Sequence, residues 1–123
     1  MDISDIQEKL RNFSRERDWD QYHSPKNLAM ALAAEAGELL EIYQWLTEQE
    51  SNNPDDKIRK QTSEELADIL IYIIKMADKL NIDLVDSVNN KIAINEKKYP
   101  AKLVKGKANK YTHYQKTGDK DGI

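Results

Sequence analysis

Cysteine is absent from the 123 residues of this chain, so disulfide bonds and thiol catalysis are both excluded. Glycine and proline are scarce, with 4 and 3 residues, and no segment shows the alternating pattern of a half-buried strand. No apolar run approaches the roughly 18 residues that a membrane span needs. The N-terminal segment MDISDIQEKLRNF is too charged for a secretory signal. We therefore expect a cytoplasmic, all-α protein without a membrane partner.

A dominant basic stretch is missing as well. The 19 Lys and Arg residues and 22 Asp and Glu residues give a net charge of −3, which argues against a protein that binds nucleic-acid polymers. Hydrophobic residues still make up 39% of the chain, enough for a modest core. The length suits one domain, which we place at residues 1–114, followed by a flexible C-terminal tail at residues 115–123.

Apolar residues recur at spacings of three and four, which predicts helices. Ser24 and Pro25 form a strong helix start, because a capping hydroxyl precedes proline at the first helical position. Tyr99 and Pro100 end the last helix, since the residue before proline disfavours helical backbone. The intervening segments 18–23 and 47–56 are predicted as loops, and the chain beyond Pro100 as an extended tail. The four predicted helices, which would form a four-helix bundle, are 3–17, 24–46, 55–80 and 84–98.

Two pairs of acids, Glu35 with Glu38 and Glu65 with Asp68, are each three residues apart on predicted helices. Acids at this spacing project from one helix face. Glu35 falls in the middle of the apolar stripe of its helix, where a carboxylate is costly unless it is paired or bound to a metal. Glu41 is predicted to point to the far side, into solvent. The second helix also offers Glu64, either solvated or as a reserve ligand, and Asp68 could instead pair with a core Lys or Arg.

If the two helix faces meet, four carboxylates surround one small volume. They cannot share a dry site unless cations neutralise them. Mg²⁺ is the natural cation, because it is hard and prefers oxygen ligands. The two acidic pairs therefore point to metal-assisted chemistry on a phosphate substrate.

With these residues in place, the chain resembles the MazG-like all-α nucleoside triphosphate pyrophosphohydrolases, and most of all the dCTP pyrophosphatase type. The family motif is E-x-x-E, a spacer, and E-x-x-D, and here a spacer of 26 residues separates Glu38 from Glu65. The similarity covers about residues 3–114. Further segments follow in the family's order: RDWDQYHSPKNL, GELLEIYQW, EELADILIYI, NKIAINEKKYP and KANKYTHY.

The resemblance implies hydrolysis of a (deoxy)nucleoside triphosphate, dCTP or a related dNTP, to the monophosphate and pyrophosphate, for clearance of unwanted nucleotides. It implies that Glu35, Glu38, Glu65 and Asp68 form the catalytic metal site for Mg²⁺, with Mn²⁺ as a substitute. It also implies a homo-oligomer, a dimer or a tetramer built from dimers. The long apolar helices independently favour such assembly, because exposed apolar patches mark interfaces.

The resemblance also suggests where the rest of the nucleotide binds. Three aromatic residues match the family's base pocket, and Asn95 suits a base edge because it both donates and accepts hydrogen bonds. The alternatives are that Trp19 and Trp45 are both core residues and that Lys91 and Lys98 form a solvated helix face. His23 is interpreted as structural, and Lys110 with Tyr111 could cover the site. The predicted substrate-binding residues are Trp19, Trp45, Tyr72, Lys91, Asn95, Lys98 and Tyr99.

Two positions depart from the family pattern and bear on base preference. Glu96 reverses a charge in a segment that is richer in arginine in dCTP-type relatives, and Leu10 replaces an expected polar residue. A dUTPase or a phosphoribosyl-ATP pyrophosphohydrolase of the same superfamily remains an alternative, as does a non-catalytic helical partner protein. A di-iron carboxylate bundle is disfavoured, because neither histidine lies in a Glu-x-x-His pair.

Overall fold

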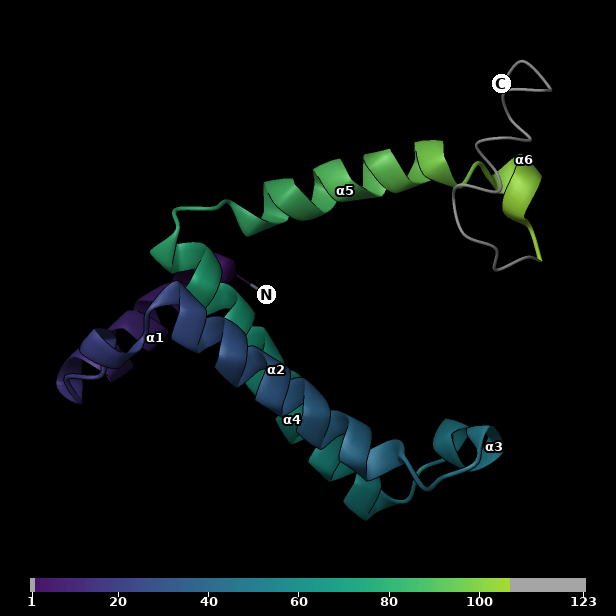
Figure 1. Cartoon of the computed structure of the whole chain (residues 1–123), viewed down its shortest axis with the longest axis horizontal. Coiled ribbons are helices and arrows are strands. Elements are labelled where there is room, and N and C mark those ends of the chain that lie inside the picture. The colour runs from purple at the N-terminus through teal and green to yellow at the C-terminus, as the bar shows by residue number, and fades with distance from the viewer. Residues whose placement is uncertain (1, 107–123) are drawn as a thin grey trace. The chain divides into compact units, whose positions relative to one another are not determined.

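A computed structural model of the chain describes residues 2–106, and every regular element in that range is a helix (Figure 1). The all-α prediction is confirmed. The chain divides into two compact units, residues 1–82 and 83–123. Within the described range, no helix is both long and apolar enough to cross a membrane.

The first helix, α1 (Ile3–Glu16), begins and ends with local polar contacts. The Asp2 carboxylate accepts a hydrogen bond from the Ser4 backbone N–H at 2.9 Å, which satisfies a free donor of the first turn. Beyond the C-terminus, Asp18 adopts a positive φ of 54°. The Trp19 N–H then reaches back to the Ser14 carbonyl at 2.9 Å. These contacts end the helix and fix the backbone at Trp19.

The segment after α1 was predicted as a loop, and it contains one turn of 3-10 helix, η1 (Asp20–Tyr22). Next comes α2 (Pro25–Tyr43), which starts as predicted: the Ser24 hydroxyl accepts from the Asn27 N–H at 3.1 Å. The helix ends at Tyr43, three residues earlier than expected. Its continuation is stopped because Thr47 takes an extended conformation to cap the following helix.

That following helix, α3 (Glu48–Asn52), lies in a segment predicted to be a loop, and that prediction was wrong. The Thr47 hydroxyl accepts from the Glu50 N–H at 3.1 Å, and the Glu50 carboxylate accepts from the Thr47 N–H at 2.9 Å. This reciprocal capping box stabilises a single short turn of helix. A second short helix, α6 (Ala101–Val104), likewise occupies part of the predicted extended tail.

The longest helix is α4 (Asp56–Lys79). The Asp55 carboxylate caps it by accepting from the Ile58 N–H at 2.8 Å. At the other end Asn81 has a positive φ of 54°, and the Ile82 N–H donates to the Ala77 carbonyl at 2.8 Å. Both ends of α4 are thus set by local sequence.

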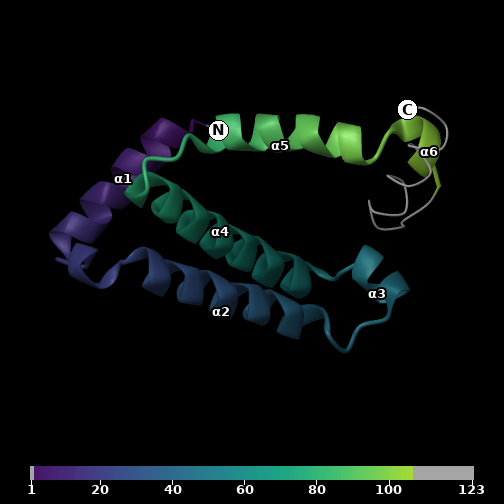
Figure 2. The same cartoon turned by 45° about the horizontal axis from the view of Figure 1, so that its top comes forward.

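Helices α2 and α4 lie side by side along their lengths, and α1 packs on α4 (Figure 1 and Figure 2). The buried core of this unit is small and consists of Ser14, Leu28, Ile74 and Ala77. The pairing of α2 with α4 is what brings the two predicted acidic faces together.

The second unit begins with α5 (Leu84–Lys98), the fourth predicted helix, at the predicted bounds. The Asp83 carboxylate caps it by accepting from the Asp86 N–H at 3.0 Å. At its end the Tyr99 N–H donates to the Asn95 carbonyl at 2.8 Å, directly before Pro100. The predicted end of this helix at Tyr99 and Pro100 is therefore confirmed.

Candidate metal centre

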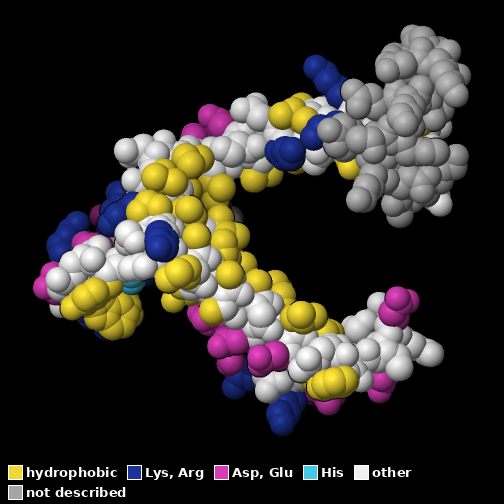
Figure 3. Space-filling view, viewed as in Figure 1, with side chains coloured by type: hydrophobic (Ala, Val, Ile, Leu, Met, Phe, Trp, Pro, Cys, Tyr) yellow, Lys and Arg dark blue, Asp and Glu magenta, His cyan; other side chains and the backbone are white. Residues whose placement is uncertain are grey.

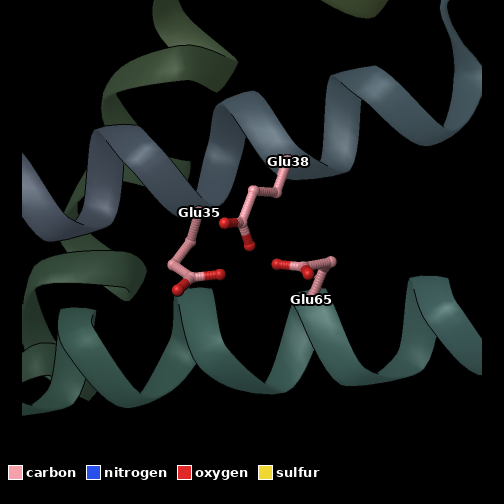
Figure 4. A group of neighbouring side chains, drawn as sticks. All are labelled: Glu35, Glu38 and Glu65. Atoms are coloured by element: carbon pink, nitrogen blue, oxygen red, sulfur yellow. The ribbon is translucent and has the colours of Figure 1, made fainter.

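Three carboxylates meet between α2 and α4 (Figure 4). Glu35 and Glu38 project from adjacent turns of α2 toward Glu65 on α4. One oxygen from each of the three lies within 4.8 Å of the others. The E-x-x-E spacing and the packing of the two helices together produce this cluster.

The interior of the cluster contains unsatisfied charge. Glu35 and Glu65 are half-buried, and the Oε2 atom of each is buried without a hydrogen-bond partner among the described residues. A buried acceptor left without a partner costs free energy, and more so when it is charged. The Glu38 side chain is exposed. The two buried oxygens therefore require either protons or a cation.

The pKa values of Glu35 and Glu38 also reflect the crowding of carboxylates in the cluster. The pKa of Glu35 is raised chiefly because its proton can be shared with the Glu65 carboxylate, and burial and the charges of Glu65 and Asp68 add to the effect. A hydrogen bond with Glu38 acts in the opposite direction. The pKa of Glu38 is raised chiefly by a hydrogen bond with Glu35 and by the charge of Glu35. Without a cation, the cluster favours retaining protons.

The ligand set fits a hard divalent cation. Only carboxylate oxygens converge here, with no sulfur or imidazole, a combination that suits Mg²⁺ or Mn²⁺ and disfavours Zn²⁺. A cation would also satisfy the two buried oxygens that lack partners. The residues of the cluster thus fit the metal that the sequence predicts.

The fourth predicted ligand, Asp68, lies one helical turn beyond Glu65 and outside the cluster of three. Its side chain is exposed, and it is close enough for its charge to raise the pKa of Glu35. It makes no ion pair within the range of residues 2–106, so the alternative of a core partner for Asp68 is not supported. The structure therefore brings three of the four acids together and leaves Asp68 beside them.

An open cavity of about 590 Å³ adjoins the cluster, a size within the range of small-molecule sites. Glu38 and Glu65 line it, and so do Glu41 and Glu64. The prediction that Glu41 points to the far side was wrong, although its side chain is exposed as expected. The spacing of three between Glu38 and Glu41 was the signal, because such residues are neighbours on one helix face.

The aromatic residues predicted for the base pocket are not core residues of the described chain. The Trp45 side chain, just after α2, is 86% exposed, and Trp19 is 44% exposed. The Trp19 ring meets the Phe13 ring edge to face at 5.7 Å and the His23 ring at 6.3 Å. Tyr72 is half-buried on α4, one turn beyond Asp68. Both tryptophans thus remain available for a ligand.

The other predicted substrate residues belong to the second unit. Lys91, Asn95 and Lys98 lie on α5 at spacings of four and three, so they share one face of that helix. Tyr99 directly follows them as the C-terminal cap. Their participation in the site stays a prediction. Lys110 and Tyr111 lie outside the described residues.

Known proteins with similar sequences, and one with a similar fold, accompany these observations. The family model described as the MazG-like family matches residues 30–113. Two curated proteins called dCTP pyrophosphatase 1, from Homo sapiens and Mus musculus, are each 40% identical over 112 residues, or 89% of this chain. The match spans 66% of each relative, just under two thirds of its length.

A solved structure of a pyrophosphatase from Archaeoglobus fulgidus is also similar. It superposes with a TM-score of 0.75 at 38% sequence identity, and the match covers 79% of this chain and 91% of that one. The helical arrangement described above therefore recurs in a protein whose relation to this chain is also evident in sequence.

Proposed function

The chain belongs to the MazG-like family, and on that premise we propose that it is a Mg²⁺-dependent nucleotide pyrophosphohydrolase that cleaves dCTP or a related deoxynucleoside triphosphate to the monophosphate and pyrophosphate. The observation that carries the proposal is the carboxylate cluster. Three oxygens lie within 4.8 Å of one another. In the same cluster, the buried Oε2 atoms of Glu35 and Glu65 have no hydrogen-bond partner among the described residues. Such a cluster lowers the stability of a protein that binds no cation, whereas a bound cation would neutralise its charge.

The roles of the carboxylates follow from their burial. Glu35 and Glu65, with buried oxygens, would hold the cation from opposite helices. The exposed Glu38, which lines the cavity, and Asp68, one turn beyond Glu65, would complete the site. Mg²⁺, when bound, supplies charge neutralisation for the triphosphate and activation of water. In the reaction a water oxygen bonds to phosphorus and the α–β phosphoanhydride P–O bond breaks. When water attacks the α-phosphorus, pyrophosphate leaves with the bridging oxygen and the electron pair; when it attacks the β-phosphorus, the nucleoside monophosphate does. In either case a carboxylate of the cluster accepts the proton of the water.

We assign the base to the three aromatic residues that the sequence predicts for it. Trp19, Trp45 and Tyr72 offer flat apolar faces, and stacking on such faces is favourable for any nucleobase. The names of the curated relatives point to dCTP. We assign the protein to clearance of unwanted nucleotides in the cytoplasm, acting as a dimer or tetramer.

A nucleotide panel tests this function. The full chain is incubated with each common ribo- and deoxynucleoside triphosphate and Mg²⁺, and the products are identified by chromatography and a pyrophosphate assay. We expect a monophosphate and pyrophosphate in equal amounts, fastest from dCTP or a related dNTP, and no turnover in excess EDTA. Release of inorganic phosphate alone, turnover in EDTA, or no turnover with any nucleotide would each contradict the proposal.

The same panel separates the related activities. For this purpose dUTP and phosphoribosyl-ATP are added to the panel, and a preference for either would keep the reaction and replace the substrate. The variant Glu38→Gln tests whether turnover arises at the cluster, and Glu8→Gln, an exposed acid on α1, is the matched control. Equal loss in both variants would argue against the assigned site.

A further inference from the structure

A second, smaller pocket lies in the first unit, away from the carboxylate cluster. Residues of α1, η1, α2 and α4 form it. The side chains in it that are most buried are Ser14, Leu28 and Ile74, and charged groups surround them. It shares no lining residue with the acidic cavity beside Glu38. The pocket is thus a separate feature placed directly over the core.

Its charge is positive once internal pairs are counted. Arg11 and Asp78 neutralise each other, because the Arg11 Nε donates to Asp78 Oδ2 at 2.8 Å and a second nitrogen contacts the other oxygen. Lys75 and Lys79 remain, opposed by Asp20 alone. Within residues 2–106, neither lysine has an ion-pair partner within 4.0 Å. The pocket therefore carries an uncompensated positive charge near buried side chains.

Burial and the neighbouring charges shift the pKa values of two groups in the pocket, Lys75 and His23. Burial lowers the pKa of Lys75, and only the charge of Asp20 opposes that effect. The pKa of His23 is lowered by burial first and then by the charge of Lys75, with Asp20 opposing and Lys79 adding. Both groups would be stabilised in their charged forms by a bound anion. Arg11 and Asp78 face the same pocket as a neutral pair.

The volume limits what the anion can be. The pocket measures about 60 Å³, whereas one water needs about 10–15 Å³ by the same measure. It therefore holds about four to six heavy atoms, which fits a tetrahedral oxyanion of five and is too small for a nucleobase. We propose that this pocket binds an oxyanion of the phosphate class, with Lys75 and Lys79 supplying the charge and His23 a hydrogen bond.

Binding of inorganic phosphate to the full chain tests the proposal. Calorimetry is done in EDTA, so that the metal centre cannot contribute, and at constant ionic strength with chloride. We expect a Kd in the millimolar range or tighter, and a loss of about tenfold or more in Lys75→Met/Lys79→Met, because two charge-assisted contacts are removed. The matched control is Lys57→Met/Lys60→Met, two exposed lysines of the same helix, which should bind as the unmodified protein does. Glu38→Gln should also bind normally.

A second measurement does not depend on the variants folding. The chain has two histidines, so the His23 imidazole resonance is assigned with His23→Asn, and its pKa should rise when phosphate is added. A phosphomonoester without a nucleobase, such as glycerol 3-phosphate, forms a second arm: binding as tight as phosphate indicates a phosphoryl group of a larger ligand, and weaker binding indicates the free ion. No phosphate binding, equal loss in the control pair, or an unmoved His23 pKa would overturn the proposal. Because no metal or triphosphate is present, these outcomes are independent of the proposed hydrolase activity.

Discussion

Glu35 and Glu65 each place one carboxylate oxygen in the interior between two helices, where no residue from 2 to 106 donates a hydrogen bond to it. A residue chosen for stability alone would not do this, because an unpartnered buried acceptor is costly. The cost is lowered by protons in the free protein and, on the proposed function, by Mg²⁺ in the active one. Stability and function therefore compete at these residues, and the competition is measurable.

Removing one charge from the cluster should separate function from folding. Glu38→Gln and Asp68→Asn should keep their helical content, measured by circular dichroism, and lose on the order of 100-fold or more in kcat, because a metal-held reaction loses several kcal/mol of stabilisation. The cation-free Glu38→Gln protein should melt at a higher temperature, since like charges crowd there. Near-normal rates in both variants would remove these residues from the metal site.

The raised pKa values of Glu35 and Glu38 predict a pH effect of definite sign. A carboxyl whose pKa is raised on folding stabilises the protein while it stays protonated, and that stability is lost as the pH rises through the raised pKa. In EDTA, unmodified protein should therefore lose melting temperature relative to Glu38→Gln as the pH rises above the ordinary glutamate range. Saturating Mg²⁺ should abolish the difference, and thermal scans across pH with and without Mg²⁺ measure it. A difference that shrinks with rising pH in EDTA would contradict the assignment.

The exposed Trp45 side chain predicts a variant in which nucleotide binding changes and stability does not. Trp45→Ala should weaken nucleotide binding by about 1–3 kcal/mol if the ring stacks on the base. Because the side chain is 86% exposed, the same change should leave the melting temperature of the dissociated chain almost unchanged. Nucleotide titration and thermal scans of one preparation measure both, and an unaltered Kd would exclude Trp45 from the site.

At the scale of elements, the helices are defined by their caps. Side chains of Asp2, Ser24, Asp55 and Asp83 each accept a backbone N–H at the start of a helix. Helices α1 and α4 end in residues with positive φ. Precise ends matter here, because the paired helices α2 and α4 carry the proposed metal ligands and a shift in either helix would separate them.

The end of α4 offers a direct test of this cap. Asn81 has a φ of 54°, a conformation that Gly adopts freely and β-branched residues strongly disfavour. Asn81→Gly should be neutral or slightly stabilising, whereas Asn81→Val should lower the free energy of unfolding by about 1–2 kcal/mol. Denaturant unfolding measures both, and Asn53→Val is the control because Asn53 has an ordinary φ of −131°. Equal effects at the two positions would show that the positive φ is not the cause.

At the scale of the molecule, the described chain leaves large apolar side chains uncovered. Leu40, Trp45 and Leu66 are 66%, 86% and 52% exposed. Apolar side chains also gather on the surface over α2 and α4 (Figure 3). The carboxylate cluster lies between these same two helices. A protein with this much uncovered apolar surface gains stability by assembling, since such patches mark interfaces.

We predict a dimer or a tetramer built from dimers, because closed symmetry is the usual result of self-association. Multi-angle light scattering should give a multiple of the chain mass. Leu66→Glu, which places a charge on exposed apolar surface, should shift the mass toward the monomer. Lys60→Glu, at an exposed polar position on the same helix, is the control. If a neighbouring subunit completes the site, activity per chain should also fall on dilution. A fully active monomer would contradict both statements.

Helix starts and the helix face on which a residue lies depend on neighbouring residues, so they could be predicted from the amino-acid sequence. Ser24 with Pro25 predicted the start of α2, and the E-x-x-E spacing placed Glu35 and Glu38 on one face, because a helix repeats about every 3.6 residues. The T-x-x-E signal at Thr47 was also present and would have predicted α3. Which acids meet depends on the tertiary structure: it brings Glu65 together with Glu35 and Glu38, leaves Asp68 beside them, and places Glu41 along the cavity. It also assembled the cationic pocket around Lys75. Those outcomes depend on how α2 and α4 are rotated against each other and on where α1 packs. Contacts between residues that are distant in sequence fix this rotation and this packing position, and the spacing of residues along one helix does not.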